Sequence, residues 1–132
     1  MDINNCIPKD KFDTAAIEQA CQMGFPALNP FLSDLLKWVQ DVNWPVAANT
    51  AALLSNAGPE ILPYIKAILR SEDGAGKFWT IDLVVRNSNP DVLLGLRSEL
   101  VRLANSPTQN DQREDVAAIA QNILTKKVFN SE

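Results

Sequence analysis

Residues 32–57 read LSDLLKWVQDVNWPVAANTAALLSNA and contain two apolar stripes separated by a Trp-Pro step. Each stripe follows the i, i+3, i+4, i+7 spacing of an amphipathic helix. The stripes are Leu32, Leu35, Leu36 and Val39, then Val46, Thr50, Leu53, Leu54 and Ala57. Because the residue before a proline is disfavoured in the α region, the first helix must end before Trp44. The stretch therefore predicts two helices joined by a sharp turn.

The turn itself, WVQDVNWPVA (38–47), allows a structural and a functional interpretation. In the structural one, Asn43 or Trp44 stands at the start of the next helix, and Asp41 accepts hydrogen bonds from its free N–H groups. The rings of Trp38 and Trp44 then wedge between helices, and removing Trp44 should cost on the order of 3–5 kcal/mol. In the functional one, these four residues form a partner-binding patch, since tryptophan is enriched in interface hot spots. The structural interpretation is favoured.

Similar stripes predict helices along the rest of the chain. Their members are Ile61, Ile65, Ile68 and Leu69; Val92, Leu96, Leu100 and Leu103; and Val116, Ile119, Ala120, Ile123 and Leu124. A first helix is expected over KFDTAAIEQACQ (11–22), starting near Asp10 or Lys11.

Proline and glycine mark the expected helix boundaries. Pro30, Pro45, Pro59 and Pro90 each stand where a helix should begin, and Gly24 and Gly58 fall just past predicted helix ends. Pro63 lies inside the segment 59–69, so either that helix is kinked or residues 59–62 form a separate turn.

The sequences of two neighbouring segments are each compatible with more than one structure. KFWTIDLVV (77–85) is rich in aromatic and β-branched residues, but a lone strand would leave its backbone groups unpaired, so a helix is predicted. DGAGK (73–77) lacks the first glycine and the Ser/Thr of a phosphate-binding loop, and it is expected to be a flexible loop between two helices.

The segments 29–36, 58–65 and 89–96 each open with Asn or Gly followed by Pro and aliphatic residues. Their spacing of about 30 residues is typical of a helical-hairpin repeat, in which neighbouring hairpins share one core. We therefore predict a single all-α domain over 1–132, with about three stacked hairpins and six or seven helices.

Composition narrows the range of functions. The 132 residues carry a net charge of −4, which disfavours a nucleic-acid binder, and they include no histidine. Cys6 and Cys21 lack metal-site or redox spacing and are expected to be free thiols, although a disulfide remains open. The N-terminus has no apolar signal region, and no apolar run approaches the roughly 18 residues of a membrane span. We expect a cytoplasmic protein without metal, cofactor or membrane partner.

Four stretches carry a resemblance to a known family: IPKDKFD (7–13), LLKWVQDVNWPVA (35–47), EILPYIKAIL (60–69) and KFW (77–79). They resemble a family of small, largely uncharacterised bacterial domains with a HEAT-like or armadillo-like helical fold. The resemblance implies a right-handed stack of helical hairpins and no particular reaction. In that pattern an aromatic residue often precedes the Lys-aromatic-Trp step, whereas Gly76 stands there in this chain.

Acidic residues supply the remaining candidates. Asp82 lies in an apolar segment and is expected to pair with Arg86, four residues on, and the alternative is a general base with a shifted pKa. Asp34, Asp41, Glu72, Asp73, Glu114 and Asp115 are candidates for an acidic face that binds a basic partner, to which Trp79 is added as an aromatic candidate.

The sequence is compatible with three classes of function. The favoured hypothesis is a non-enzymatic protein-binding module, in particular an immunity-type protein that neutralises a basic bacterial toxin. The alternatives are an enzyme using carboxylate chemistry, at Asp82 or at paired acidic residues, and a purely structural scaffold.

Overall fold

The computed structural model describes residues 6–41 and 43–130, and over these ranges it is all-helical, without a strand. The ten α-helices are α1 (Thr14–Met23), α2 (Leu32–Leu36), α3 (Ala47–Leu54), α4 (Leu62–Leu69), α5 (Gly74–Trp79), α6 (Pro90–Gly95), α7 (Arg97–Asn105), α8 (Gln109–Arg113), α9 (Val116–Leu124) and α10 (Lys127–Asn130). Short 3₁₀ segments are η2 (Asn29–Phe31), η3 (Lys37–Val39), η4 (Pro59–Ile61) and η6 (Val85–Asn87), and η5 (Thr80–Val84) is π-helical.

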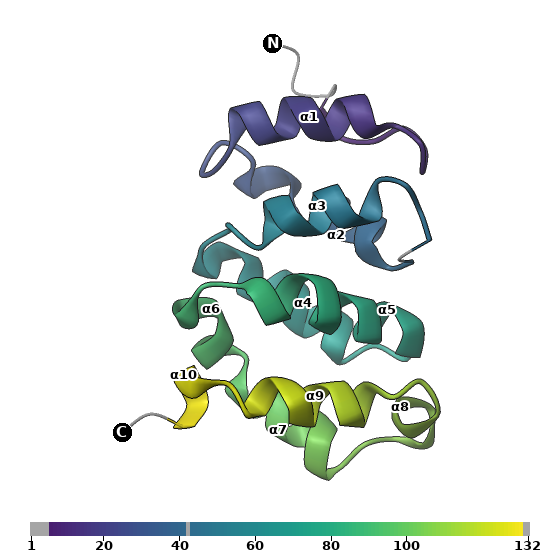
Figure 1. Ribbon diagram of the computed structural model, residues 1–132, viewed down its shortest axis with the longest axis vertical. Coiled ribbons are helices and arrows are strands. Elements are labelled where there is room, and N and C mark those ends of the chain that lie inside the picture. The colour runs from purple at the N-terminus through teal and green to yellow at the C-terminus, as the bar shows by residue number, and fades with distance from the viewer. Residues whose placement is uncertain (1–5, 42, 131–132) are drawn as a thin grey trace.

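The helices are stacked along the long axis of the molecule from α1 at one end to α7, α8 and α9 at the other, and α10 turns back to lie against α6 (Figure 1). α1 lies at one end, α2 with α3 and then α4 with α5 form the middle, and α7 with α9 lie at the other end. Packing of α3 on η5 and of α5 on α9 joins successive layers. One cluster of buried aliphatic side chains runs through all of these layers.

Four of the helices begin at the same side of this stack. α1, α3, α5 and α9 all start at the edge on the right of Figure 1, where the turns that precede them also lie. We call this side the N-terminal edge, comprising residues 9–13, 40–41, 43–46, 70–74 and 106–115. Because each helix start carries a partial positive charge, acidic side chains are favoured at such an edge.

The two stripes of residues 32–57 are buried as predicted, and the turn between them differs in detail. α3 starts at Ala47, with Val46 at the N-cap and no side-chain cap, so the expectation of Asn43 or Trp44 at the helix start is wrong. The Asp41 carboxylate accepts instead from the N–H of Asn43, at 2.9 Å, within the turn. The N–H of Val46 donates to the carbonyl of Lys11 at 3.2 Å, which ties the turn to the segment before α1.

The two tryptophans of the turn contact one another. Their rings meet edge to face, with centroids 5.7 Å apart, and both are partly buried against the core. The structure therefore supports the structural interpretation of these rings. Asn43, by contrast, is exposed.

Several helix boundaries in the structure differ from those expected from the sequence. α1 begins at Thr14 and not near Asp10 or Lys11, because the Asp13 side chain caps it by accepting from the N–H of Ala16. Gly24 follows α1 with a φ of 67°, the left-handed conformation that favours glycine. Gly58 does not end a helix, since α3 stops four residues earlier and Gly58 precedes η4 with a φ of −85°.

The prolines mostly stand where a helical segment begins. Pro59 and Pro90 open η4 and α6, and Pro30 lies within the first turn of η2. Pro63 is the second residue of α4, so residues 59–61 form a separate turn and the helix is not kinked. Pro45 is the exception, because it lies in the turn two residues before α3.

Residues 74–87 form one continuous helical run through α5, η5 and η6, which confirms the helical prediction for 77–85. The expected flexible loop at 73–77 is wrong. Asp73 is the N-cap of α5 and accepts from the N–H of Gly76 at 3.0 Å. A Cβ at position 76 would lie 2.2 Å from Oδ2 of Asp73, so a side chain there would require the Asp73 carboxylate to shift. The resembling pattern often has an aromatic residue at this position.

The described chain has more helices than the six or seven expected, because single stripes are divided. The stripe from Val92 to Leu103 is split at Leu96 into α6 and α7. The stripe from Val116 to Leu124 coincides with α9. Cys6 is buried, Cys21 is exposed, and neither forms a disulfide.

Candidate functional site

Most of the candidate binding residues lie along the N-terminal edge. Asp41 and Asn43 belong to the turn before α3, Glu72 and Asp73 precede α5, and Glu114 and Asp115 lie between α8 and α9. The segments that carry the last two groups are in contact, because the side chain of Asn110, in α8, donates to the carbonyl of Glu72 at 2.8 Å. A Cβ on Gly74 would lie 2.6 Å from Cγ of Glu114, so the absence of a side chain there allows the close approach.

The candidate carboxylates differ in the hydrogen bonds and ion pairs that they make. Asp34 lies within α2, before the chain reaches the edge, and pairs with Lys37 at 3.5 Å. Asp41 and Asp73 accept backbone N–H groups, as described above. Within the described part of the chain, the carboxylates of the remaining three candidates make no hydrogen bond or ion pair. These are Glu72, Glu114 and Asp115, and all three are exposed.

Trp79 is the aromatic candidate that lies beside these carboxylates. It is the last residue of α5 and is partly buried, with its ring perpendicular to that of Phe78 at a centroid distance of 4.8 Å. Trp79, Glu114 and Asp115 line one shallow pocket. Trp38 and Trp44 belong instead to the turn before α3.

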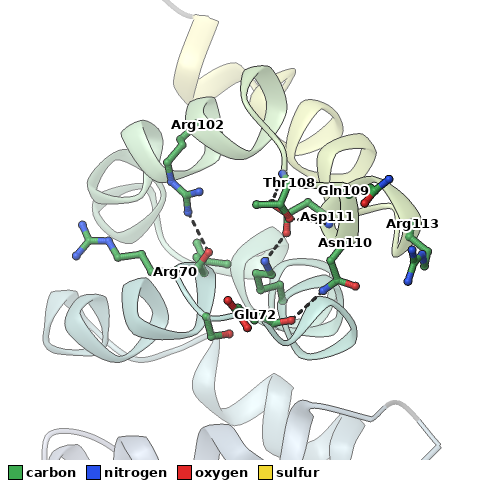
Figure 2. A pocket seen from close by; sticks show the side chains of 11 residues that line it. Arg70, Glu72, Arg102, Thr108, Gln109, Asn110, Asp111 and Arg113 are labelled. Atoms are coloured by element: carbon green, nitrogen blue, oxygen red, sulfur yellow. Dashed lines mark hydrogen bonds and ion pairs between the residues drawn. The ribbon is translucent and has the colours of Figure 1, made fainter.

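A larger pocket of about 630 Å³ opens next to this group, between the end of α4, the start of α5, the end of α7 and α8 (Figure 2). Its volume is within the range of small-molecule sites. The charged side chains that line it are Arg70, Glu72, Lys77, Arg102, Asp111 and Arg113. Sequence reasoning had proposed only Glu72 among them.

Two of the residues that line this pocket, Lys77 of α5 and Asp111 of α8, form a buried ion pair. The Lys77 side chain is only 3% exposed and that of Asp111 is fully buried. Asp111 also completes a capping box with Thr108, in which each accepts the backbone N–H of the other at 3.0–3.1 Å. The pair therefore fixes α8 against α5.

A second ion-pair network joins α4 to α7 at the other side of the pocket. Glu99, with a side chain 8% exposed, accepts from Nε of Arg70 at 2.8 Å and from Nη2 of Arg102 at 3.4 Å. Arg102 also donates to the carbonyl of Leu69 at 3.0 Å, which satisfies an unpaired group at the end of α4.

Four of the six charged side chains that line this pocket are held in ion pairs, and within the described residues Glu72 and Arg113 are not. Lys77, Arg70 and Arg102 each have a carboxylate partner, and Figure 2 shows the side chain of Arg113 pointing away from Arg102 and Asp111. We interpret the two networks as ties between layers of the stack.

Asp82, the candidate general base, is also held in an ion pair. Its Oδ1 accepts from Nε and Nη2 of Arg86 at 3.1 and 2.9 Å, which confirms the predicted pairing. Arg86 further donates to the side chain of Asn122 at 2.9 Å. This contact links the helical run 74–87 to α9.

Sequence signals for the missed residues existed but were weak. Thr108 and Asp111 have the spacing of a capping box, and Lys77 stands at the start of an otherwise apolar run. Lys77 and Asp111 are 34 positions apart in the sequence. Whether they pair depends on how α5 packs against α8, and the residues around either one do not specify this packing.

A family model described as a domain of unknown function (DUF5071) matches residues 6–124. The chain belongs to this family. The expected membership of an uncharacterised family is thereby confirmed, and the description of DUF5071 names no activity. The comparison with curated proteins gave no match.

Two further observations concern the described residues of this DUF5071 domain. No group of three or more cysteine, aspartate or glutamate side chains among them is placed to hold a metal ion. None of their helices combines the length and the apolar character that crossing a membrane requires.

The paired carboxylates of this DUF5071 domain predict sensitivity to acid. Burial raises the pKa of Glu99, but hydrogen bonds and charges from Arg70 and Arg102 outweigh it, so the pKa lies below its usual 4.5. For Asp111, burial is likewise outweighed by Lys77 and Thr108, and the pKa lies below its usual 3.8. A carboxyl with a lowered folded-state pKa stabilises the fold above its unfolded pKa, and this contribution is lost as pH falls through the folded pKa.

We therefore expect the urea midpoint to fall as pH is lowered from about 5 to about 3. Glu99→Gln should make this fall shallower, because the substituted group no longer titrates. Asp34→Asn, at an exposed pair, should leave the slope unchanged. A pH slope that is the same in the wild type and in Glu99→Gln would contradict this assignment.

Proposed function

We propose that this domain is a non-enzymatic protein-binding module that binds a basic partner through its N-terminal edge. The observation that carries the proposal is a set of three exposed carboxylates, Glu72, Glu114 and Asp115, that make no hydrogen bond or ion pair among the described residues. Two of them, Glu114 and Asp115, share a shallow pocket with the partly buried ring of Trp79. Aromatic residues at the centre of charged surfaces are typical of binding hot spots. A net charge of −4 adds long-range attraction toward a basic surface.

Two finer proposals accompany this one. The paired packing of α2 with α3, α4 with α5 and α7 with α9 supports a HEAT-like or armadillo-like stack of three hairpins, an architecture that commonly presents binding surfaces. Within the binding hypothesis, we propose an immunity-type protein that acts in the cytoplasm and neutralises a basic toxin domain, because an acidic surface can occupy a site built for nucleic acid.

Charge-reversal kinetics test the use of this edge. A binding partner is first isolated from the source organism with the wild-type domain, identified by mass spectrometry and purified. We expect its association rate constant to fall on the order of tenfold as salt rises, since exposed charges are screened over roughly 8 Å at physiological salt. Dissociation should change less.

Glu114→Lys combined with Asp115→Lys should slow association at low salt. The matched control is Glu18→Lys combined with Asp91→Lys, which makes the same change of charge at exposed positions of α1 and α6. Association that is independent of salt and of both reversals would overturn the electrostatic proposal. Reproducible turnover of a substrate by the purified domain would overturn its non-enzymatic part.

A further inference from the structure

A shallow pocket of about 210 Å³ lies at the junction of α5 and α8. It is lined by Ala75, Phe78, Trp79, Arg113, Glu114 and Asp115. Its volume is below the roughly 300–1,000 Å³ of pockets that enclose whole small molecules. The size is suited to one side chain of a partner and not to a complete cofactor.

The walls of this pocket combine aromatic and anionic groups. The rings of Trp79 and Phe78 lie perpendicular to one another, and none of the cations of the described chain lies over the Trp79 ring. Glu114 and Asp115 contribute carboxylates that are exposed and have no partner among the described residues. Aromatic rings and carboxylates both attract cations, and together they favour a cationic guest.

The local backbone holds both carboxylates at the pocket. Glu114 lies against Gly74, where any side chain would displace it. Asp115 is the N-cap residue of α9, yet its side chain makes none of the hydrogen bonds that an N-cap aspartate ordinarily makes. It also adopts a left-handed conformation with a φ of 61°, in which asparagine or glycine would serve as well. The capping role therefore does not account for an acidic side chain at this position.

We propose that this pocket binds an arginine side chain of the partner. Arginine is favoured over lysine because its planar guanidinium can stack on an aromatic ring and donate two parallel hydrogen bonds to a carboxylate. The inference rests on the proposed function, since it assigns the partner's chemistry at the same edge. Arg113 lines the pocket as well and opposes a cationic guest, so it limits the affinity.

The test uses the whole domain and short capped peptides as probes. Acetyl-Gly-Arg-Gly-amide is titrated into isotope-labelled protein while ¹H–¹⁵N spectra are recorded, and the lysine, glutamine and glutamate peptides are titrated in parallel. We expect saturable shifts at the Trp79 indole and at the amides of 114 and 115, with a dissociation constant on the order of tens of millimolar, as suits one exposed cation–π contact and one exposed ion pair. The lysine peptide should bind more weakly, and the other two should not saturate.

Three variants of the domain should differ in their affinity for the arginine peptide. Glu114→Gln combined with Asp115→Asn should weaken binding of the arginine peptide at least about fivefold, the effect of losing roughly 1 kcal/mol of charge attraction. Arg113→Gln should strengthen it. Glu18→Gln combined with Asp91→Asn, which removes two exposed carboxylates elsewhere, should leave it unchanged.

Shifts that are equal for all four peptides, or that map away from Trp79, would overturn the pocket assignment. Lysine binding as tight as arginine would overturn the choice of guest. If none of the peptides binds but a protein partner still binds at the N-terminal edge, the pocket assignment is wrong and the proposed function stands. Saturable arginine binding without any protein partner would reject the proposed function and keep the pocket.

Discussion

Asp111→Ala should lower the free energy of unfolding by about 3–5 kcal/mol, the range for removing one member of a buried ion pair. The substitution leaves the Lys77 ammonium, 3% exposed, without its carboxylate partner. It also removes the capping box at the start of α8, which adds to the loss. The measurement is the urea midpoint, followed by far-UV circular dichroism.

Two further variants separate the charge from the cap. Lys77→Met leaves a buried carboxylate that still accepts the N–H of Thr108, so it should also destabilise the domain. Combining Lys77→Met with Asp111→Asn removes both charges and should cost less than the sum of the single substitutions. Asp34→Ala breaks an exposed pair and should change stability by no more than about 0.5 kcal/mol. A loss below about 1 kcal/mol for Asp111→Ala would show that the pair is not buried in solution.

The spacing of apolar residues along the sequence was sufficient to predict much of this fold. The stripe from Val116 to Leu124 predicted α9, and the stripes on either side of the Trp-Pro step are buried as predicted, because helical periodicity depends on which face meets the core. Boundaries were less predictable, since several caps compete within a few residues. Asp13 caps α1 although Asp10 was the expected start.

The candidate site shows where local pattern is insufficient. Residues 73–77 lack an intact phosphate-binding motif and were expected to form a flexible loop, yet Asp73 caps a helix that begins at Gly74. The buried Lys77–Asp111 pair and the Glu99 network join residues 29 to 34 positions apart. Such contacts follow from the packing of layers, so the sequence identified the exposed acidic residues and missed the buried ones.

Trp44→Ala should lower the free energy of unfolding by about 3 kcal/mol, near the lower end of the range for removing a buried aromatic side chain. The ring packs against the core cluster and meets Trp38 edge to face, but part of it remains accessible, which reduces the loss relative to a fully buried ring. Trp38→Ala should act in the same direction. In a double-mutant cycle the two should show a coupling of roughly 0.5–1.5 kcal/mol, as measured for contacting aromatic pairs.

Phe12→Ala is the matched control for Trp44→Ala, because Phe12 is 66% exposed and its removal should change the urea midpoint little. Binding of the isolated partner is measured alongside stability for each variant. If Trp44→Ala leaves the midpoint unchanged and abolishes binding, the ring is an interface hot spot and the structural interpretation is wrong. If stability falls and the variant that remains folded binds normally, the Trp44 ring stabilises the packing of α2 with α3, and recognition depends on other residues, for which Glu72, Trp79, Glu114 and Asp115 are the candidates.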